Sequence, residues 1–168
     1  MKDVQVRVLI TGGTLDKVYN RVEGQLSFSS THVQEIFVQA GCLGRHIVEK
    51  VMLKDSLFFT DEDREKIACF CIKAEEDNLL ITHGTDTMVE TAKVLGSLNL
   101  NKTIVLTGAM APATVEKSDA LFNLGFAFCS AKLLDKGVYI AMNGKIFPYD
   151  NVIKNKEKGL FEPIETKD

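Results

Sequence analysis

The stretch VQVRVLITGGT, from Val4 to Thr14, decides the fold of this chain. Mostly β-branched and apolar residues end abruptly in two glycines and a threonine, which is typical of a strand buried on both faces of a parallel sheet. Gly12 and Gly13 free the backbone for unusual dihedral angles and for close approach of a ligand. Ligands gather at the carboxyl ends of such strands, so the Thr14 hydroxyl is placed for chemistry. The alternative is a tight turn in which Thr14 caps a helix.

Length and composition describe one ordinary globular domain over residues 1–168. The chain is 45% hydrophobic and 26% charged, and its net charge of −3 gives no electrostatic basis for binding nucleic acid or an anionic membrane. No apolar run approaches the ~20 residues of a membrane span. The four cysteines form no CxxC pair, so we expect buried free thiols rather than zinc ligands or disulfides, and a cytoplasmic location.

Strand-like and helix-like segments alternate along the chain. Strands are expected at residues 4–12, 46–53, 78–82, 102–107 and 137–142, and helices follow Thr31, Thr60, Thr87 and Ser118. This alternation predicts an α/β domain, a three-layer open sheet that is mainly parallel, has about five strands and is flanked by helices. Residues 15–30 are expected to form a long loop, and Asn143-Gly144 a hairpin turn. The charged tail, about residues 151–168, is expected to lead out of the fold.

Small polar residues cluster where the strands end. The first, third and fourth strands finish in TGGT, THGTDT and TGAM, and in a parallel sheet these ends share one edge. No GxGxxG, P-loop or GxSxG pattern accompanies them. Hydroxyls, the Asp86 carboxylate and the Lys102 amine remain, and a desolvated lysine beside a threonine and an aspartate can relay a proton. Taken singly, Asp86 also suits a helix N-cap, and Lys102 a solvated strand start.

In this order, the motifs resemble those of the bacterial-type L-asparaginases. The resemblance rests on TGGT (11–14), THGTDTM (82–88) and KTIVLTGAM (102–110), and continues through SDA (118–120), NL (123–124) and GVYIAMNGKIF (137–147). It covers essentially the whole chain but only the N-terminal domain of the family, so the smaller C-terminal domain is expected to be missing. The resemblance implies the fold of that N-terminal domain and hydrolysis of a side-chain amide without metal or cofactor.

The resemblance also implies two threonine-centred catalytic sets. Thr14 matches the nucleophile that attacks the amide carbonyl, assisted by a loop tyrosine, for which Tyr19 is the candidate. Thr85, Asp86 and Lys102 match the second set, in which the threonine is hydrogen-bonded to the lysine and the aspartate binds the α-amino group of the substrate.

The remaining implied contacts hold the substrate. Ser56 matches the serine that holds the substrate α-carboxylate, and backbone N–H groups near Gly13 and Thr85 can form an oxyanion hole. Two features depart from many relatives: Tyr19 lies closer to Thr14 along the chain, and Ala111 replaces the arginine of GAMRP, a change expected at a surface or interface.

Two functions follow from this reading. One is an amidohydrolase acting on L-asparagine or a related small amide, and the other is an amino-acid-binding module that keeps an asparaginase-like pocket without turnover. Keeping Thr14, Thr85, Asp86 and Lys102 together favours the enzyme. In the family a neighbouring subunit's C-terminal domain completes each site, and a chain without that domain exposes a surface that relatives cover. We therefore expect a homo-oligomer, most simply a dimer.

Overall fold

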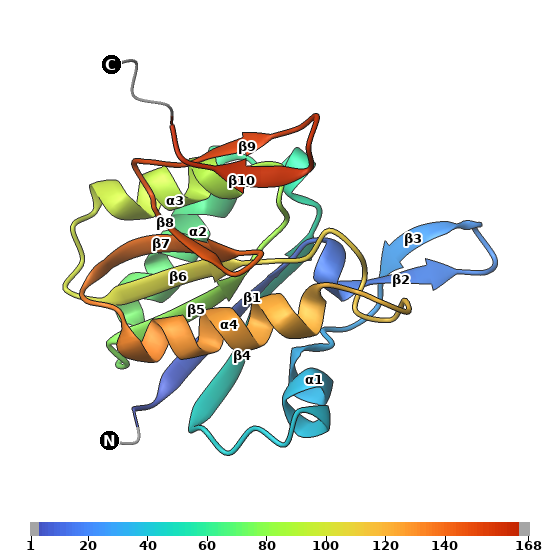
Figure 1. Ribbon diagram of the computed structural model, residues 1–168, viewed down its shortest axis with the longest axis horizontal. Coiled ribbons are helices and arrows are strands. Elements are labelled where there is room, and N and C mark those ends of the chain that lie inside the picture. Colours follow the sequence, from blue (N-terminus) through green and yellow to red (C-terminus); the bar gives the residue numbers. More distant parts are fainter. Residues whose placement is uncertain (1–3, 165–168) are drawn as a thin grey trace.

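A six-stranded sheet forms the centre of the protein, in a computed structural model that describes residues 4–164 (Figure 1). The strand order is β4-β1-β5-β6-β7-β8; the first five strands are parallel and β8 is antiparallel to β7. The strands are β1 (Val6–Gly12), β4 (His46–Lys54), β5 (Asn78–Thr82), β6 (Thr103–Thr107), β7 (Gly137–Met142) and β8 (Lys145–Pro148). The expected parallel sheet and the hairpin at Asn143-Gly144 are confirmed, with β8 adding a sixth strand.

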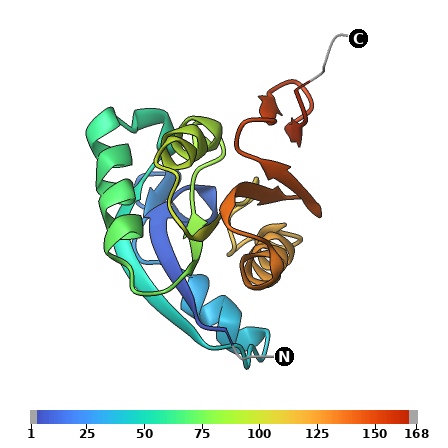
Figure 2. The same ribbon diagram turned by 90° about the vertical axis from the view of Figure 1, so that its left-hand side faces the viewer.

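Helices cover both faces of this sheet, which gives three layers (Figure 2). The helices are α1 (Val33–Gln39), α2 (Asp61–Lys73), α3 (Met88–Ser97) and α4 (Ala120–Leu133). Side chains alternate between the two faces along each strand. Leu9, for example, packs with the core beneath α2 and α3, whereas Val8 and Ile10 pack with the core beneath α1 and α4. The predicted three-layer α/β fold is thus confirmed.

The parallel strands bring their carboxyl ends to one edge of the sheet. β1 lies between β4 and β5, and β6 lies beside β5, so the segments after Gly12, Lys54, Thr82 and Thr107 are neighbours. Two short 3₁₀ helices occupy this edge, at Thr14–Asp16 after β1 and Ser56–Phe58 after β4. The convergence expected of the small polar clusters is present.

Two segments differ from the sequence expectation. Residues 15–30 contain an antiparallel hairpin, β2 (Lys17–Asn20) paired with β3 (Gln25–Phe28), rather than an irregular loop. The segment from residue 151 does not lead out of the fold: β9 (Ile153–Asn155) pairs with β10 (Leu160–Glu162), and Val152 and Phe161 are buried in the core beneath α2 and α3. These apolar anchors hold the second hairpin on the domain. Residues 165–168 lie outside the described part of the chain.

Two further expectations can be checked against the side chains. All four cysteines are free thiols, but only Cys71 is buried, whereas Cys69 and Cys129 are exposed and Cys42 is partly exposed. Within residues 4–164, none of the helices combines the length and the apolar character needed to cross a lipid bilayer.

Candidate active site

Three loops meet so closely at the carboxyl edge that only glycine fits between them. Gly13, whose φ of 86° lies in the left-handed region, packs against the backbone of Gly84, and a Cβ on Gly13 would overlap it. A Cβ on Gly84 would in turn overlap the Ser56 side chain. The loops after β1, β4 and β5 are thus in direct contact. Thr14 and Thr85, each next to one of these glycines, belong to the same edge, as the sequence predicts.

Ser56 is held in this edge by its neighbours. Asp55 precedes it and accepts a hydrogen bond from Leu57 N (3.0 Å), which fixes the start of the 3₁₀ helix. The Thr87 hydroxyl donates to the Ser56 carbonyl (2.8 Å), and Thr87 N donates to Ser56 Oγ at 3.4 Å. Ser56 is only 1% exposed. Its hydroxyl is therefore buried at the carboxyl edge of the sheet, beside the loop that carries Thr85.

A lysine contacts both Thr85 and Asp86. Lys154 Nζ donates to Thr85 Oγ1 at 2.8 Å and forms an ion pair with Asp86 Oδ1 at 2.7 Å. Thr85 is nearly buried, and the Lys154 side chain is 13% exposed, so this ammonium is largely shielded from solvent. The lysine comes from β9, which the buried Val152 and Phe161 anchor. Threonine, aspartate and lysine therefore form one hydrogen-bonded group.

Lys102, the lysine predicted for this position, lies elsewhere. It precedes β6, at the amino end of the strand, and its Nζ donates to the carbonyls of Ala74 (2.7 Å) and Glu76 (2.8 Å). These carbonyls follow α2, at the edge of the sheet opposite Thr85. The expectation that Lys102 contacts Thr85 is wrong, because a residue at the start of a parallel strand cannot reach the carboxyl edge. Its ammonium instead caps the carbonyls after α2.

The residues after β6 shape the wall beside Thr85. The Thr85 hydroxyl lies 3.8 Å from Met110 Sδ. Asp119 accepts hydrogen bonds from Met110 N and Ala111 N, each at 3.0 Å, and from Asn123 Nδ2 at 2.9 Å. The SDA and NL motifs therefore position this loop rather than contribute reactive groups. The partly exposed Ala111 uses its backbone in this network.

The Thr14 hydroxyl has no hydrogen-bond partner within residues 4–164, and the residue is partly exposed at the carboxyl edge of the sheet. Tyr19, the candidate assistant, lies on β2, and its side chain is 62% exposed. The hairpin that carries it extends away from the sheet (Figure 1). The structure shows no contact between Tyr19 and Thr14, so the role of Tyr19 stays a prediction.

His83 fixes the backbone of the β5 loop from beneath. The ring is fully buried, with Nδ1 2.7 Å from Gly84 O and Nε2 2.8 Å from Thr91 Oγ1. Burial lowers the pKa of His83 to about 4, so the ring is neutral at pH 7. A neutral ring whose Nδ1–H donates to Gly84 O leaves Nε2 to accept from Thr91. Both ring nitrogens are thus committed to holding the loop.

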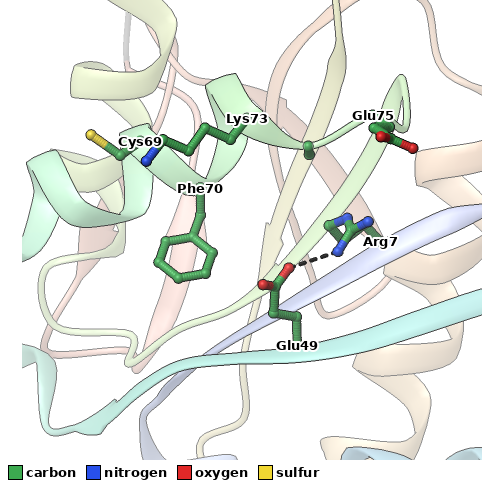
Figure 3. A pocket seen from close by; sticks show the side chains of 7 residues that line it. Arg7, Glu49, Cys69, Phe70, Lys73 and Glu75 are labelled. Atoms are coloured by element: carbon green, nitrogen blue, oxygen red, sulfur yellow. Dashed lines mark hydrogen bonds and ion pairs between the residues drawn. The ribbon is translucent and has the colours of Figure 1, made fainter.

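A separate cavity of about 290 Å³ lies away from these residues, between α2 and the β1–β4 side of the sheet (Figure 3). Part of its charged wall is paired: Arg7 forms an ion pair with Glu49 (2.7 Å) across the cavity and a second one with Glu76 (2.5 Å). None of the residues that the sequence selects lines this cavity. The candidate site therefore remains the open edge where Gly13, Ser56 and Thr85 meet.

Lys154 is the functional residue that sequence reasoning missed. The charged character of residues 151–168 hid two short apolar pairs, Val152-Ile153 and Leu160-Phe161, separated by a turn containing Gly159. Such pairs around a glycine indicate a short hairpin. With Lys154 in place, the edge holds a hydroxyl without a partner, a hydroxyl–ammonium–carboxylate group, and a buried serine. These are the groups needed for nucleophilic attack, proton transfer and binding of a zwitterion.

Comparison with known proteins identifies the family of this chain. Residues 5–161 match the family described as "Asparaginase, N-terminal". An L-asparaginase of Thermococcus kodakarensis is 32% identical over 98% of this chain and 52% of its own length, and its solved structure superposes with a TM-score of 0.85. A probable periplasmic L-asparaginase of Haemophilus influenzae is 36% identical over 89% of this chain and 46% of its own. The chain thus spans about half the length of these relatives and belongs to the asparaginase family, of which it matches the N-terminal domain.

Proposed function

We propose that this chain carries the nucleophile of an asparaginase-like amidohydrolase, which hydrolyses the side-chain amide of L-asparagine or a related small amide and releases ammonia. The observation that carries the proposal is the Thr85–Lys154–Asp86 group, which lies beside the TGGT loop at the carboxyl edge. A module that only bound an amino acid would not need a shielded ammonium on the Thr85 hydroxyl. The relatives' printed names agree with an amidohydrolase.

In the proposed reaction, Thr14 Oγ attacks the amide carbon and the C–N bond breaks. The proton of the Thr14 hydroxyl and the leaving NH₂ group combine as ammonia, with Thr85 and Lys154 passing the proton. Backbone N–H groups near Gly13 and Thr85 stabilise the oxyanion. Water then hydrolyses the acyl ester, which releases the acid and regenerates Thr14. No step requires a cofactor.

Charge determines how the substrate is oriented. Asp86 Oδ1 is paired with Lys154, while the second carboxylate oxygen makes no hydrogen bond within residues 4–164 and is proposed to bind the substrate α-ammonium. The buried Ser56 hydroxyl is proposed to bind the α-carboxylate. Tyr19 is proposed to assist Thr14 from the hairpin.

The deciding experiment measures ammonia release from asparagine, glutamine and small amides, together with calorimetric binding of aspartate. We expect the parent chain to release ammonia and Thr14→Ala to lose turnover while keeping aspartate binding. Binding of aspartate without ammonia release by the parent would instead show an amino-acid-binding module. A parent chain that neither releases ammonia nor binds aspartate would contradict both functions.

We also propose that the chain forms a homodimer and acts in the cytoplasm. Support for the dimer comes from the outer face of α4, which is apolar although it points away from the sheet. Phe122, Phe126, Cys129 and Leu133 follow one another at helical spacing, and Phe122 and Leu133 are more than 60% exposed. The location rests on the free thiols alone, and one relative is named as periplasmic.

A further inference from the structure

The β2–β3 hairpin needs an anchor at its base. It extends away from the body of the domain (Figure 1), and among the described residues 4–164 the strands β2 and β3 pair only with each other. A two-stranded hairpin is marginally stable in water by itself. Its orientation relative to Thr14 therefore depends on its contacts with the domain, above all in the segments where it leaves and rejoins the domain, at Asp16 and Thr31.

Asp16 joins these two segments. The residue follows Thr14 by two positions and is fully buried. Its Oδ1 accepts hydrogen bonds from the Thr31 hydroxyl and from His32 N, both at 2.9 Å. One carboxylate oxygen thus links the exit and the return of the chain, 15 and 16 residues apart.

Burying a carboxylate costs free energy unless the group is paired and hydrogen-bonded. Burial raises the pKa of Asp16, although the hydrogen bonds from His32 and Thr31 oppose that rise. The second oxygen, Oδ2, is buried and has no partner within residues 4–164. Both hydrogen bonds therefore use the single acceptor Oδ1, and the side-chain oxygen of an asparagine, which is uncharged and has the same shape, can replace it.

We propose that Asp16 is a positioning residue that latches the base of the β2–β3 hairpin and thereby fixes the arm carrying Tyr19 relative to Thr14. The part that concerns Tyr19 and Thr14 rests on the proposed function. The latch itself does not, because it concerns only the order of the hairpin. An experiment on the hairpin therefore separates the two.

Limited trypsin digestion reads the latch directly. Arg21 is exposed in the hairpin turn, and cleavage after it creates a new N-terminus at Val22 that mass spectrometry identifies. We expect Asp16→Ala to speed this cleavage on the order of tenfold or more, since it removes both hydrogen bonds. Asp16→Asn keeps the Oδ1 acceptor and is expected to be cleaved at the parent rate. The exposed Asp150→Ala is the matched control and is expected to change nothing.

A graded variant keeps the test decisive if Asp16→Ala does not fold. Thr31→Val preserves side-chain volume and removes one of the two hydrogen bonds, so it is expected to speed cleavage after Arg21 by a smaller factor. The latch is overturned if Thr31→Val and any folded Asp16→Ala are cleaved at the parent rate. It is also overturned if Asp16→Asn is cleaved as fast as the alanine variant.

Kinetics then test the positioning role. In Asp16→Ala the kcat for amide hydrolysis is expected to fall while aspartate affinity is retained, because Ser56 and Asp86 lie on other elements. Asp16→Asn is expected to restore kcat. An unchanged kcat in a variant whose hairpin is cleaved rapidly would overturn the positioning role. Absence of hydrolysis in the parent would instead refute the proposed function and leave the trypsin result to decide the latch.

Discussion

At the scale of single residues, the ammonium of Lys154 has two partners, and its removal affects each differently. Lys154→Met keeps most of the side-chain volume but leaves the Thr85 hydroxyl without its 2.8 Å donor and Asp86 without its counter-ion. A relay lysine acts in the transition state, so we expect turnover to fall by roughly 10²–10⁴ with the chain still folded. Ammonia release from the preferred amide measures the loss.

Lys102→Met is the matched control for that variant. It removes the ammonium that caps the carbonyls of Ala74 and Glu76, far from the site, so turnover should stay close to the parent value. The free energy of unfolding should fall by about 1–3 kcal/mol, because two partly buried carbonyls lose a charged donor. Equal loss of turnover in both lysine variants would contradict the assignment of Lys154.

The two lysines show what sequence alone determines at this scale. Gly13, Ser56, Thr85 and Asp86 were predictable because each follows the carboxyl end of a strand, where parallel strands converge. Lys102 shares a motif with the strand it precedes, but that strand of five residues spans roughly 16 Å and separates it from the edge. Lys154 comes from a different hairpin, so no local pattern connects it to Thr85. That contact arises only from tertiary packing.

Acid should weaken the fold through His83. The ring has a pKa of about 4 in the folded chain and an ordinary value of 6.5 when unfolded. Between these pH values the unfolded chain binds more protons than the folded one, so the free energy of unfolding falls as the pH is lowered. The expected contribution of His83 is about 3 kcal/mol between pH 7 and pH 4.

Urea unfolding at a series of pH values measures this dependence, and His83→Gln separates it from the carboxylates. The variant cannot gain that proton, so its stability should fall less steeply than the parent's between pH 6.5 and 4. Parallel curves for the two proteins would show that His83 does not contribute.

At the scale of elements, a second contact ties the β2–β3 hairpin to the loop of Ser56 at the carboxyl edge. Lys17 forms an ion pair with Asp55 at 2.5 Å, and its ammonium also lies over the Phe28 ring of β3. Burial raises the pKa of Asp55, but Lys17 and Leu57 N outweigh this effect and hold it below its ordinary value. Since Asp55 also starts the 3₁₀ helix of Ser56, the pair couples the hairpin to that helix.

A double-mutant cycle tests this coupling. Lys17→Met and Asp55→Asn each break the ion pair, and the asparagine keeps the acceptor for Leu57 N. We expect the second substitution to cost little once the first is present, with a coupling of about 0.5–1 kcal/mol in the free energy of unfolding. Additive losses would mean that the hairpin and the Ser56 helix are independent.

Elements with strong periodicity were predictable, and short strands were not. Helix α2 begins where a capping threonine and acidic residues indicate, with Thr60 and Asp63 forming a capping box. By contrast, β2, β3, β9 and β10 have only three or four residues each, too few for alternation to distinguish them from loops. Their positions depend on a few tertiary contacts, such as those of Asp16 and Phe161.

At the scale of the whole molecule, the fold class followed from the alternation of strands and helices, whereas the surface did not. Each buried strand needs helices on both faces, which fixes the three layers. The chain spans about half of its relatives' length, and its sequence contains no comparable pattern that identifies which partner packs on an outer surface. The apolar outer face of α4 is such a surface, and the proposed homodimer depends on it.

The outer face of α4 carries an exposed aromatic pair. Phe122 and Phe126 stack with ring centroids 6.3 Å apart and planes 4° apart, and Phe122 is 62% exposed, so water is in contact with a rigid aromatic pair. Packing such a pair against a second copy buries apolar surface, and each Å² buried stabilises the dimer by about 25 cal/mol. Gly125 lies between the two, and a Cβ there would meet nothing, so another helix can approach closely.

Phe122→Glu places a charge in the centre of that contact and should convert a dimer into a monomer at micromolar concentration, as sedimentation velocity would measure. Ile72→Glu, on the exposed side of α2, is the matched control and should leave the dimer intact. At a concentration low enough for all three proteins to be monomeric, both variants should unfold at the same temperature as the parent, because neither side chain belongs to the two buried cores. A parent that sediments as a monomer, or a Phe122→Glu variant that stays dimeric, would place the interface elsewhere or remove it.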